Sequence, residues 1–283
     1  MFNVNKDIGF VPLRGTDNVF LEKGIEVTRG RKFRKLPGKE NTKDVVTFKY
    51  TEYRYLIQCI ESGYLFFARN RKWEDPFDKK YYRDEIVING TPYHVFCLCI
   101  TNHDVANEDS LWKVYEGTHN HESQSEIENR FVRITYNMKT LYEELGRIGD
   151  YKFYLAHVNY VERNQFFNEN ECTYDNLDSY LLKLCKKRIA FEYENEYRLF
   201  AVHEGAYNDN ENKENGIKIH MNYKNVIDNV TLPPLKPHAS SYERYIRNEM
   251  YKGIKEQGLK CNISTLYEGD QCDNTRNYKK YKL

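Results

Sequence analysis

Hydrophobic and polar positions repeat at two spacings along the chain, and the spacing indicates the element that each segment forms. Apolar residues at every third or fourth position predict helices, and alternate apolar positions predict strands. We expect helices over 51–62, 110–117, 138–145, 174–189 and 240–258, and strands over 45–50, 64–68, 85–89, 93–101, 131–137, 151–161, 191–202 and 217–222. Because the two types mix without a regular strand–helix–strand rhythm, we predict an α+β fold of mixed, mostly antiparallel sheets with flanking helices.

The predicted strand 191–202 carries the most informative pattern, because one of its faces changes from charged to apolar. That face consists of Glu192, Glu194, Glu196, Arg198, Phe200 and Val202. Carboxylates at the edge of a buried region are costly unless they are paired or functional, and Arg198 is a ready partner for Glu196. Two interpretations stay open at this point: a catalytic site, or a solvated strand with a Glu–Arg ladder.

Length and composition narrow the class of protein. The 283 residues are enough for a sizeable core, and a net charge of +1 argues against a global preference for nucleic acid or membrane. We expect a soluble, cytoplasmic protein, because apolar runs are short and Met1–Asp7 lacks the order of a secretory signal. The seven cysteines follow no disulfide framework, so most are expected to be reduced thiols.

Three parts are expected along the chain. They are a basic N-terminal arm or hairpin over 1–44, a single α+β domain of catalytic type over 45–266, and a polar C-terminal tail over 267–283. The arm contains basic residues that could contact the phosphates of a nucleic acid: Arg29, Arg31, Lys32, Arg34 and Lys35. A solvated basic arm explains the same run, and both interpretations stay open.

Signatures of several enzyme classes are missing from the sequence. It contains no Gly-rich phosphate loop with a lysine and no Gly-x-Gly-x-x-Gly after a strand, which argues against a nucleotide triphosphatase and a Rossmann enzyme. Cys97 and Cys99 share a strand face, but no second pair of ligands follows at zinc spacing. We therefore predict no metal site.

Short motifs resemble, in the same order, those of the bacterial family called domain of unknown function 2971. They are Phe48-Lys49-Tyr50-Thr51, residues 62–67, Glu74-Asp75-Pro76-Phe77-Asp78, residues 97–101, residues 110–115, residues 193–198 and residues 230–234. The resemblance spans about residues 45–266. The chain departs from the family pattern where Lys49 or Tyr50 replaces a common histidine and where Glu74 replaces asparagine.

A second, weaker similarity concerns the site. A polar end of a first strand, a hydroxyl or thiol on a middle strand, and a late Glu-x-Glu are similar to the split NAD site of ADP-ribosyltransferases, including DNA-modifying toxins. This similarity implies a split sheet, NAD as substrate, and a bacterial toxin or phage-defence effector that modifies nucleic acid or protein. It implies catalysis by Glu196 and Glu194, and NAD contacts from Lys49, Tyr50, Thr51, Thr101, Tyr115 and Arg198.

The implied chemistry suits these residue types. Cleavage of the nicotinamide–ribose bond develops oxocarbenium charge, which the carboxylate of Glu196 would stabilise. Glu194 would orient the acceptor or remove its proton, and Arg198 would hold the pair ionised. We expect Glu196, Arg198, Tyr50 and Thr101 to line one cleft. A nucleic-acid-binding or processing protein without NAD chemistry, and a non-catalytic interaction module, stay open as alternatives, as do the acceptor and the oligomeric state.

Overall fold

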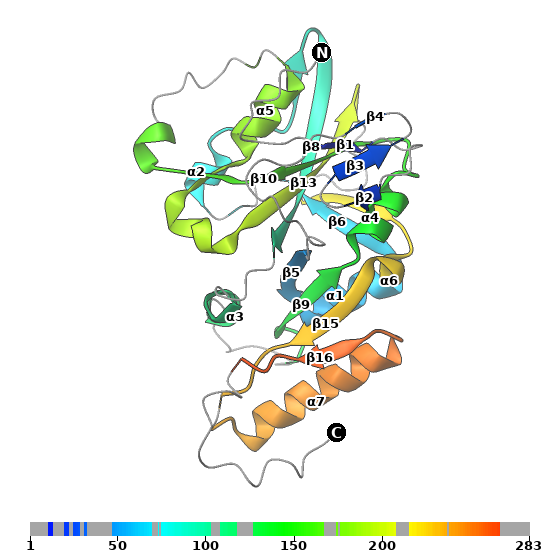
Figure 1. The fold of residues 1–283 in the computed structure, drawn as a ribbon, viewed down its shortest axis with the longest axis vertical. Coiled ribbons are helices and arrows are strands. Elements are labelled where there is room, and N and C mark those ends of the chain that lie inside the picture. The colour runs from blue at the N-terminus through cyan, green and yellow to red at the C-terminus, as the bar shows by residue number, and fades with distance from the viewer. Residues whose placement is uncertain are drawn as a thin grey trace.

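A sheet of 11 strands organises the part of the chain that the computed structural model describes (Figure 1). The described residues are 11–13, 20–22, 25–28, 31–32, 47–69, 73, 75–102, 108–117, 127–166, 174, 176–207, 215–236 and 238–266. Glu74, Arg29, Arg34, Lys35 and the predicted tail 267–283 lie outside them, so the expectations for those residues stay predictions.

The long strand β8 lies at the centre of the sheet and is shared by several partners. In spatial order the main path is β1 (Val11–Leu13), β10 (Lys152–His157), β13 (Glu196–Glu204), β8 (Thr91–Asn102), β5 (Thr47–Glu52), β9 (Phe131–Tyr136), β15 (Ile227–Leu232) and β16 (Cys261–Ile263). Beside β5, β8 also pairs with β6 (Tyr64–Ala68) and β7 (Ile86–Ile88), and β14 (Gly216–His220) pairs with β6. All pairs are antiparallel except β15 with β16.

Two small sheets accompany the large one. Strands β11 (Asn159–Val161) and β12 (Lys186–Arg188) form a parallel pair. Strands β2 (Phe20–Glu22), β3 (Ile25–Thr28) and β4 (Arg31–Lys32) form an antiparallel sheet within the predicted arm, and β1, also in that segment, pairs with β10.

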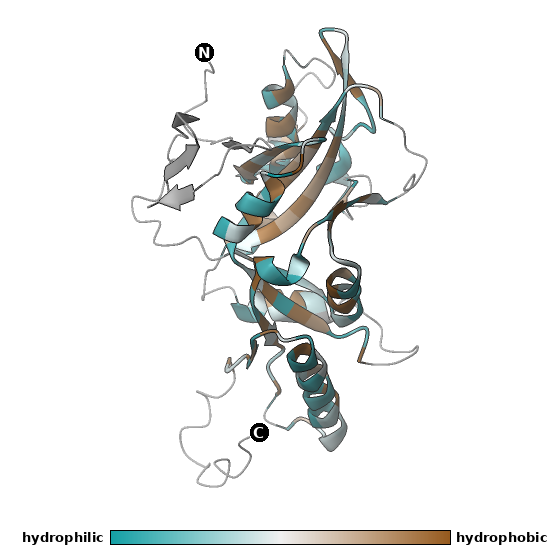
Figure 2. Cartoon of the chain, turned by 90° about the vertical axis from the view of Figure 1, so that its right-hand side faces the viewer, coloured by the Kyte–Doolittle hydropathy of each residue, from teal (hydrophilic) through white to brown (hydrophobic). Residues whose placement is uncertain are grey.

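Helices cover both faces of the large sheet, and the buried hydrophobic residues form three clusters. The helices are α1 (Tyr53–Ser62), α2 (Pro76–Lys79), α3 (Glu108–Gly117), α4 (Met138–Leu145), α5 (Leu177–Leu184), α6 (Tyr223–Val226) and α7 (Ser241–Glu256), with 3-10 turns η3 (Arg163–Phe166) and η4 (Ile189–Glu194). Helices α1, α4, α6 and α7 pack on one face, whereas α5 and α3 pack on the other with separate clusters. Figure 2 shows apolar strands running through the molecule and a largely polar α7 at one end. The predicted mixed, mostly antiparallel α+β class is confirmed.

Local sequence signals account for several element boundaries. Helix α1 ends at Gly63, whose left-handed backbone (φ 62°) suits a residue without a Cβ. Helix α7 begins after Ser240, whose side chain accepts a hydrogen bond from the Glu243 N–H while Glu243 reaches back to Ser240. Both boundaries match the sequence predictions.

Three predicted elements around the candidate site differ from the structure. The helix expected over 174–189 ends at Leu184 and is followed by β12, and the strand expected over 151–161 is divided into β10 and β11. The strand expected over 191–202 begins only at Glu196, because η4 precedes it and Asn195 turns the chain in a left-handed conformation (φ 43°). Asparagine tolerates that conformation better than most residues, and the β11–β12 hydrogen bonds override the helical periodicity.

Two further predictions concern the whole described chain. The five described cysteines, Cys59, Cys97, Cys99, Cys185 and Cys261, are free, as expected from the sequence. Within the described residues, no helix is both long enough and apolar enough to cross a membrane.

Candidate active site

The register of the central strands places four predicted site residues on one face of the sheet. Glu196 of β13 lies opposite Thr101 of β8, and Thr101 lies opposite Phe48 of β5. Since side chains alternate along a strand, Arg198 and Tyr50 lie on the same face as these residues. The four residues thus share one face, and all four are buried.

Lys49 and Thr51, to which the sequence assigned NAD contacts, are not part of this group. They lie opposite Ile134 and Val132 of β9, both of which belong to the core on the other side of the sheet. The pleat of β5 therefore directs them away from the face that carries Tyr50 and Glu196. The NAD contacts implied for Lys49 and Thr51 stay a prediction, and the structure shows only that these residues face away from Tyr50.

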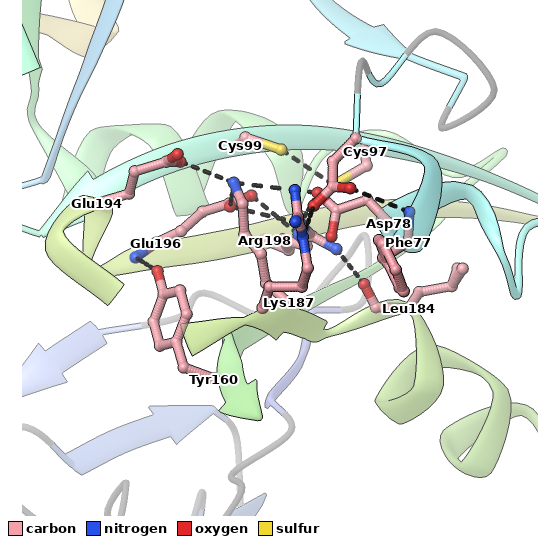
Figure 3. A network of polar contacts seen from close by, with 12 residues as sticks. Phe77, Asp78, Cys97, Cys99, Tyr160, Leu184, Lys187, Glu194, Glu196 and Arg198 are labelled. Atoms are coloured by element: carbon pink, nitrogen blue, oxygen red, sulfur yellow. Dashed lines mark hydrogen bonds and ion pairs between the residues drawn. The ribbon is translucent and has the colours of Figure 1, made fainter. Parts of the chain in front are cut away.

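Arg198 is the centre of a buried ion network on this face (Figure 3). Its Nε donates to Glu196 Oε1 at 2.8 Å, and its Nη2 donates to Asp78 Oδ2 of α2 at 3.1 Å. Its Nη1 donates to the backbone carbonyl of Leu184, and its guanidinium carbon lies 3.8 Å from the centre of the Trp73 ring. Each of the three guanidinium nitrogens of Arg198, which is 1% exposed, therefore donates a hydrogen bond within the protein.

Lys187 of β12 adds a second cation between the two glutamates. Its Nζ lies 2.8 Å from Glu194 Oε2, 2.9 Å from Glu196 Oε2, and 3.9 Å from Asp78 Oδ2. Glu194 therefore joins the network although it lies on η4 and not, as predicted, on the strand. Figure 3 shows how β12, η4, β13 and α2 bring these side chains together.

The charges of the network shift the pKa values of its carboxyl groups in opposite directions. Burial alone would raise the pKa of Glu196, but the positive charges of Arg198 and Lys187 outweigh it and hold that pKa well below its usual range. For Glu194 and Asp78, burial outweighs the neighbouring cations and raises the pKa. Glu196 is thus a fixed anion, whereas Glu194 can exchange a proton more readily.

An aromatic cluster connects the network to the first strand of the site. The rings of Tyr50 and Tyr115 stack with their centres 4.8 Å apart, and Trp112 meets Tyr50 edge-on at 4.8 Å. Burial, followed by the negative charges of Glu194 and Glu196, raises the pKa of Tyr115. Burial raises the pKa of Tyr50 to about 12, so its hydroxyl keeps its proton. The structure therefore groups Tyr115 and Tyr50 with the two glutamates.

Three residues of the network were not identified from the sequence. Lys187 was placed inside a predicted helix, although the basic triplet Lys186-Lys187-Arg188 just before the acidic segment was a signal for pairing. Asp78 lies in the motif Glu74-Asp75-Pro76-Phe77-Asp78 but has no predicted role, and Trp73 lies in none of the predicted elements or motifs. Within the described ranges, no group of three or more histidine, cysteine, aspartate or glutamate side chains is arranged to hold a metal ion.

Comparisons with known proteins do not assign the chain to a family. No protein-family model matches it, and no curated protein matches it. Among solved structures, it is similar to DarT from Thermus sp. 2.9 in complex with NAD+, with a TM-score of 0.30, 8% identity, and coverage of 78% of this chain and 96% of that chain. The same protein in complex with ADP-ribosylated ssDNA gives a TM-score of 0.30, 9% identity, and coverage of 78% and 94%. A TM-score of 0.30 is too low to support an argument about activity.

Proposed function

We propose that this protein is an ADP-ribosyltransferase-like enzyme that cleaves the nicotinamide–ribose bond of NAD. The observation that carries the proposal is the position of Glu196, a buried anion on the sheet face that also presents Tyr50 and Thr101. A preorganised negative charge stabilises a developing oxocarbenium ion more than it stabilises the substrate. Glu194, next to it, is a carboxyl group with a raised pKa that can take part in proton transfer.

In the proposed reaction, the bond between the ribose carbon and the nicotinamide nitrogen breaks, and both of its electrons leave with nicotinamide. The ribose carbon then bonds to a nucleophilic oxygen or nitrogen of the acceptor, whose proton passes to Glu194. Because the Glu194 side chain is 17% exposed and Glu196 is more deeply enclosed, we place the approach of the substrate on the Glu194 side. Glu196 would then act through its charge, since Arg198 and Lys187 occupy its oxygens.

The direct test is release of nicotinamide from NAD by the purified protein, measured by chromatography. The assay is run with NAD alone and then with single-stranded DNA, RNA or cell protein, and transfer is followed with labelled NAD. We expect release that increases when the right acceptor is present. Absence of release under all four conditions, from protein with a cooperative unfolding transition, would contradict the proposal.

A non-catalytic interaction module is the second candidate, and the pairing of both Glu196 oxygens inside the protein favours it. Glu196 is 3% exposed, and its two oxygens accept hydrogen bonds from Arg198 and Lys187. A buried network of this kind can also serve only to fix the arrangement of β12, β13 and α2. Under this alternative no nicotinamide is released in any assay.

We propose that the acceptor is a nucleic acid or a protein and that this chain acts as a toxin or phage-defence effector.

If the basic run binds nucleic acid, replacing Arg29, Arg31 and Lys32 with alanine will weaken binding of single-stranded DNA. Each lost phosphate contact should reduce the slope of log affinity against log salt by about 0.7. Fluorescence anisotropy over a salt series measures both effects. Unchanged affinity at low salt would identify the run as a solvated segment without a role in nucleic-acid binding.

A further inference from the structure

Lys187 lies at the junction of the two proposed catalytic carboxylates. Its ammonium group contacts Glu194 at 2.8 Å and Glu196 at 2.9 Å, and its side chain is only 10% exposed. An ammonium group carries three donors, so it can serve both carboxylates at the same time. The parallel pairing of β12 with β11, in which Lys187 lies opposite Tyr160, fixes the strand that presents it.

The two glutamates depend on Lys187 to different degrees. Glu196 is also held by Arg198, which contacts both of its oxygens. Within the described residues, the ion pair of Glu194 is the one with Lys187. Removal of the Lys187 charge therefore leaves Glu196 with a cation but leaves Glu194 close to two other carboxylates, those of Glu196 and Asp78.

We propose that Lys187 is a positioning residue that couples Glu194 to Glu196 and keeps Glu194 ionised beside a fixed anion. The inference rests on the proposed function for its role in catalysis, but the coupling itself depends only on this geometry. The charged and titratable groups that face Glu194 are Lys187 from β12, Glu196 from β13, Asp78 from α2, Tyr115 from α3, Tyr160 from β11 and Tyr193 from its own turn η4. Lys187 is the cation among them that touches Glu194 directly.

The expected pH dependence has a definite sign. The pKa of Glu194 is already raised, first by burial and then by the negative charges of Glu196 and Asp78, while Lys187 lowers it. Without Lys187 the pKa rises further. A carboxyl group with a raised pKa in the folded state contributes stability below its ordinary pKa and loses it as the pH rises through the folded value. The loss of folding stability caused by removing the Lys187 charge must therefore grow as the pH rises.

The first test uses Lys187→Met, which keeps a similar shape and removes the charge, with Lys187→Arg as the conservative variant. We expect the urea midpoint of Lys187→Met to fall below that of the parent by an amount that increases from about pH 5 to about pH 8. Lys187→Arg should show a smaller increase. The double variant Lys187→Met/Glu194→Gln should show a smaller pH dependence, because Glu194 no longer titrates while Glu196 and Asp78 keep Arg198 as their cation. Lys260→Met, at an exposed ion pair with Asp228, is the matched control and should show no trend.

If the urea midpoint falls by the same amount at every pH in both Lys187→Met and Lys187→Met/Glu194→Gln, the proposed coupling is wrong. The second test follows NAD cleavage, where the acidic limb of the kcat profile should move to higher pH in Lys187→Met and move less in Lys187→Arg. An unmoved acidic limb in an active enzyme would overturn the catalytic part of the inference. The expected urea trend in a protein that never cleaves NAD would reject the proposed function while supporting the coupling, so the two failures are distinguishable.

Discussion

Replacement of Glu196 with glutamine is expected to lower the rate of NAD cleavage by roughly two to four orders of magnitude. This is the range for losing one preorganised electrostatic or acid–base group. Glutamine keeps the shape of glutamate but removes the negative charge that would face the oxocarbenium ion. The measurement is kcat for nicotinamide release at saturating NAD, which separates a loss in the chemical step from a loss in binding.

The same substitution should also reduce the free energy of unfolding. Glutamine at position 196 would relieve a buried carboxylate if that carboxylate were alone, but here Arg198 and Lys187 both donate to it. Breaking a buried ion pair from one side costs about 3–5 kcal/mol. Activity must therefore be compared under conditions in which the variant is folded, as checked by circular dichroism.

Glu192→Gln provides the matched control for Glu196→Gln. Glu192 lies four residues earlier on η4 and is exposed, outside the ion network. Its replacement should leave both turnover and stability unchanged. Full activity of folded Glu196→Gln would remove Glu196 from the catalytic assignment, and the interaction-module alternative would then gain support.

The sequence predicted those features of the fold that depend on local patterns. The end of α1 at Gly63 and the start of α7 after Ser240 follow from capping residues, whose effect is confined to one helix turn. The common face of Glu196 and Arg198 follows from strand alternation, which holds in β13 even though the strand begins five residues later than expected. The α+β class follows from the order of the elements.

The ion network could not be assembled from the same patterns, because Asp78 and Trp73 are far from the other members in the chain and Lys187 lies within a helical pattern. Arg198 and Asp78 are separated by 120 positions, and the helix α2 that carries Asp78 has only four residues. Lys187 reaches the carboxylates because a parallel strand pair ends the helical periodicity at Leu184. Lys49 and Thr51 share a sequence motif with Tyr50, but they face the other side of the sheet. Pairing between distant segments decides the position of Lys187, whereas the alternation of side chains along β5 decides that of Lys49 and Thr51.

Replacement of Arg198 with methionine is expected to reduce the free energy of unfolding at least as much as Glu196→Gln does. Methionine fills much of the same volume but leaves Glu196 and Asp78 without their closest cation. The Leu184 carbonyl loses a donor, and the Trp73 ring loses the guanidinium stacked on it. We expect the free energy of unfolding to fall by about 3–5 kcal/mol, measured by urea denaturation at neutral pH.

Arg147→Met is the matched control, because Arg147 forms an exposed ion pair with Glu144 at 2.5 Å. Surface pairs contribute about 0–1 kcal/mol, so the control should unfold almost as the parent does. The pH dependence gives a second check on the role of Arg198. Burial would raise the pKa of Glu196, but Arg198 and Lys187 depress it, so their pairing stabilises the fold above the ordinary glutamate pKa of 4.5 and is lost as the pH falls.

The stability difference between the parent and Arg198→Met should therefore be greatest near neutral pH and should shrink as the pH falls below the ordinary glutamate value. Asp78 acts in the same direction, because Arg198 lowers its pKa against the larger effect of burial, and the loss of Arg198 would raise that pKa further. A variant that is as stable as the parent would show that the network does not hold β13 to α2. A loss that does not change with pH would show that packing around Trp73, and not the charge of Arg198, accounts for the stability.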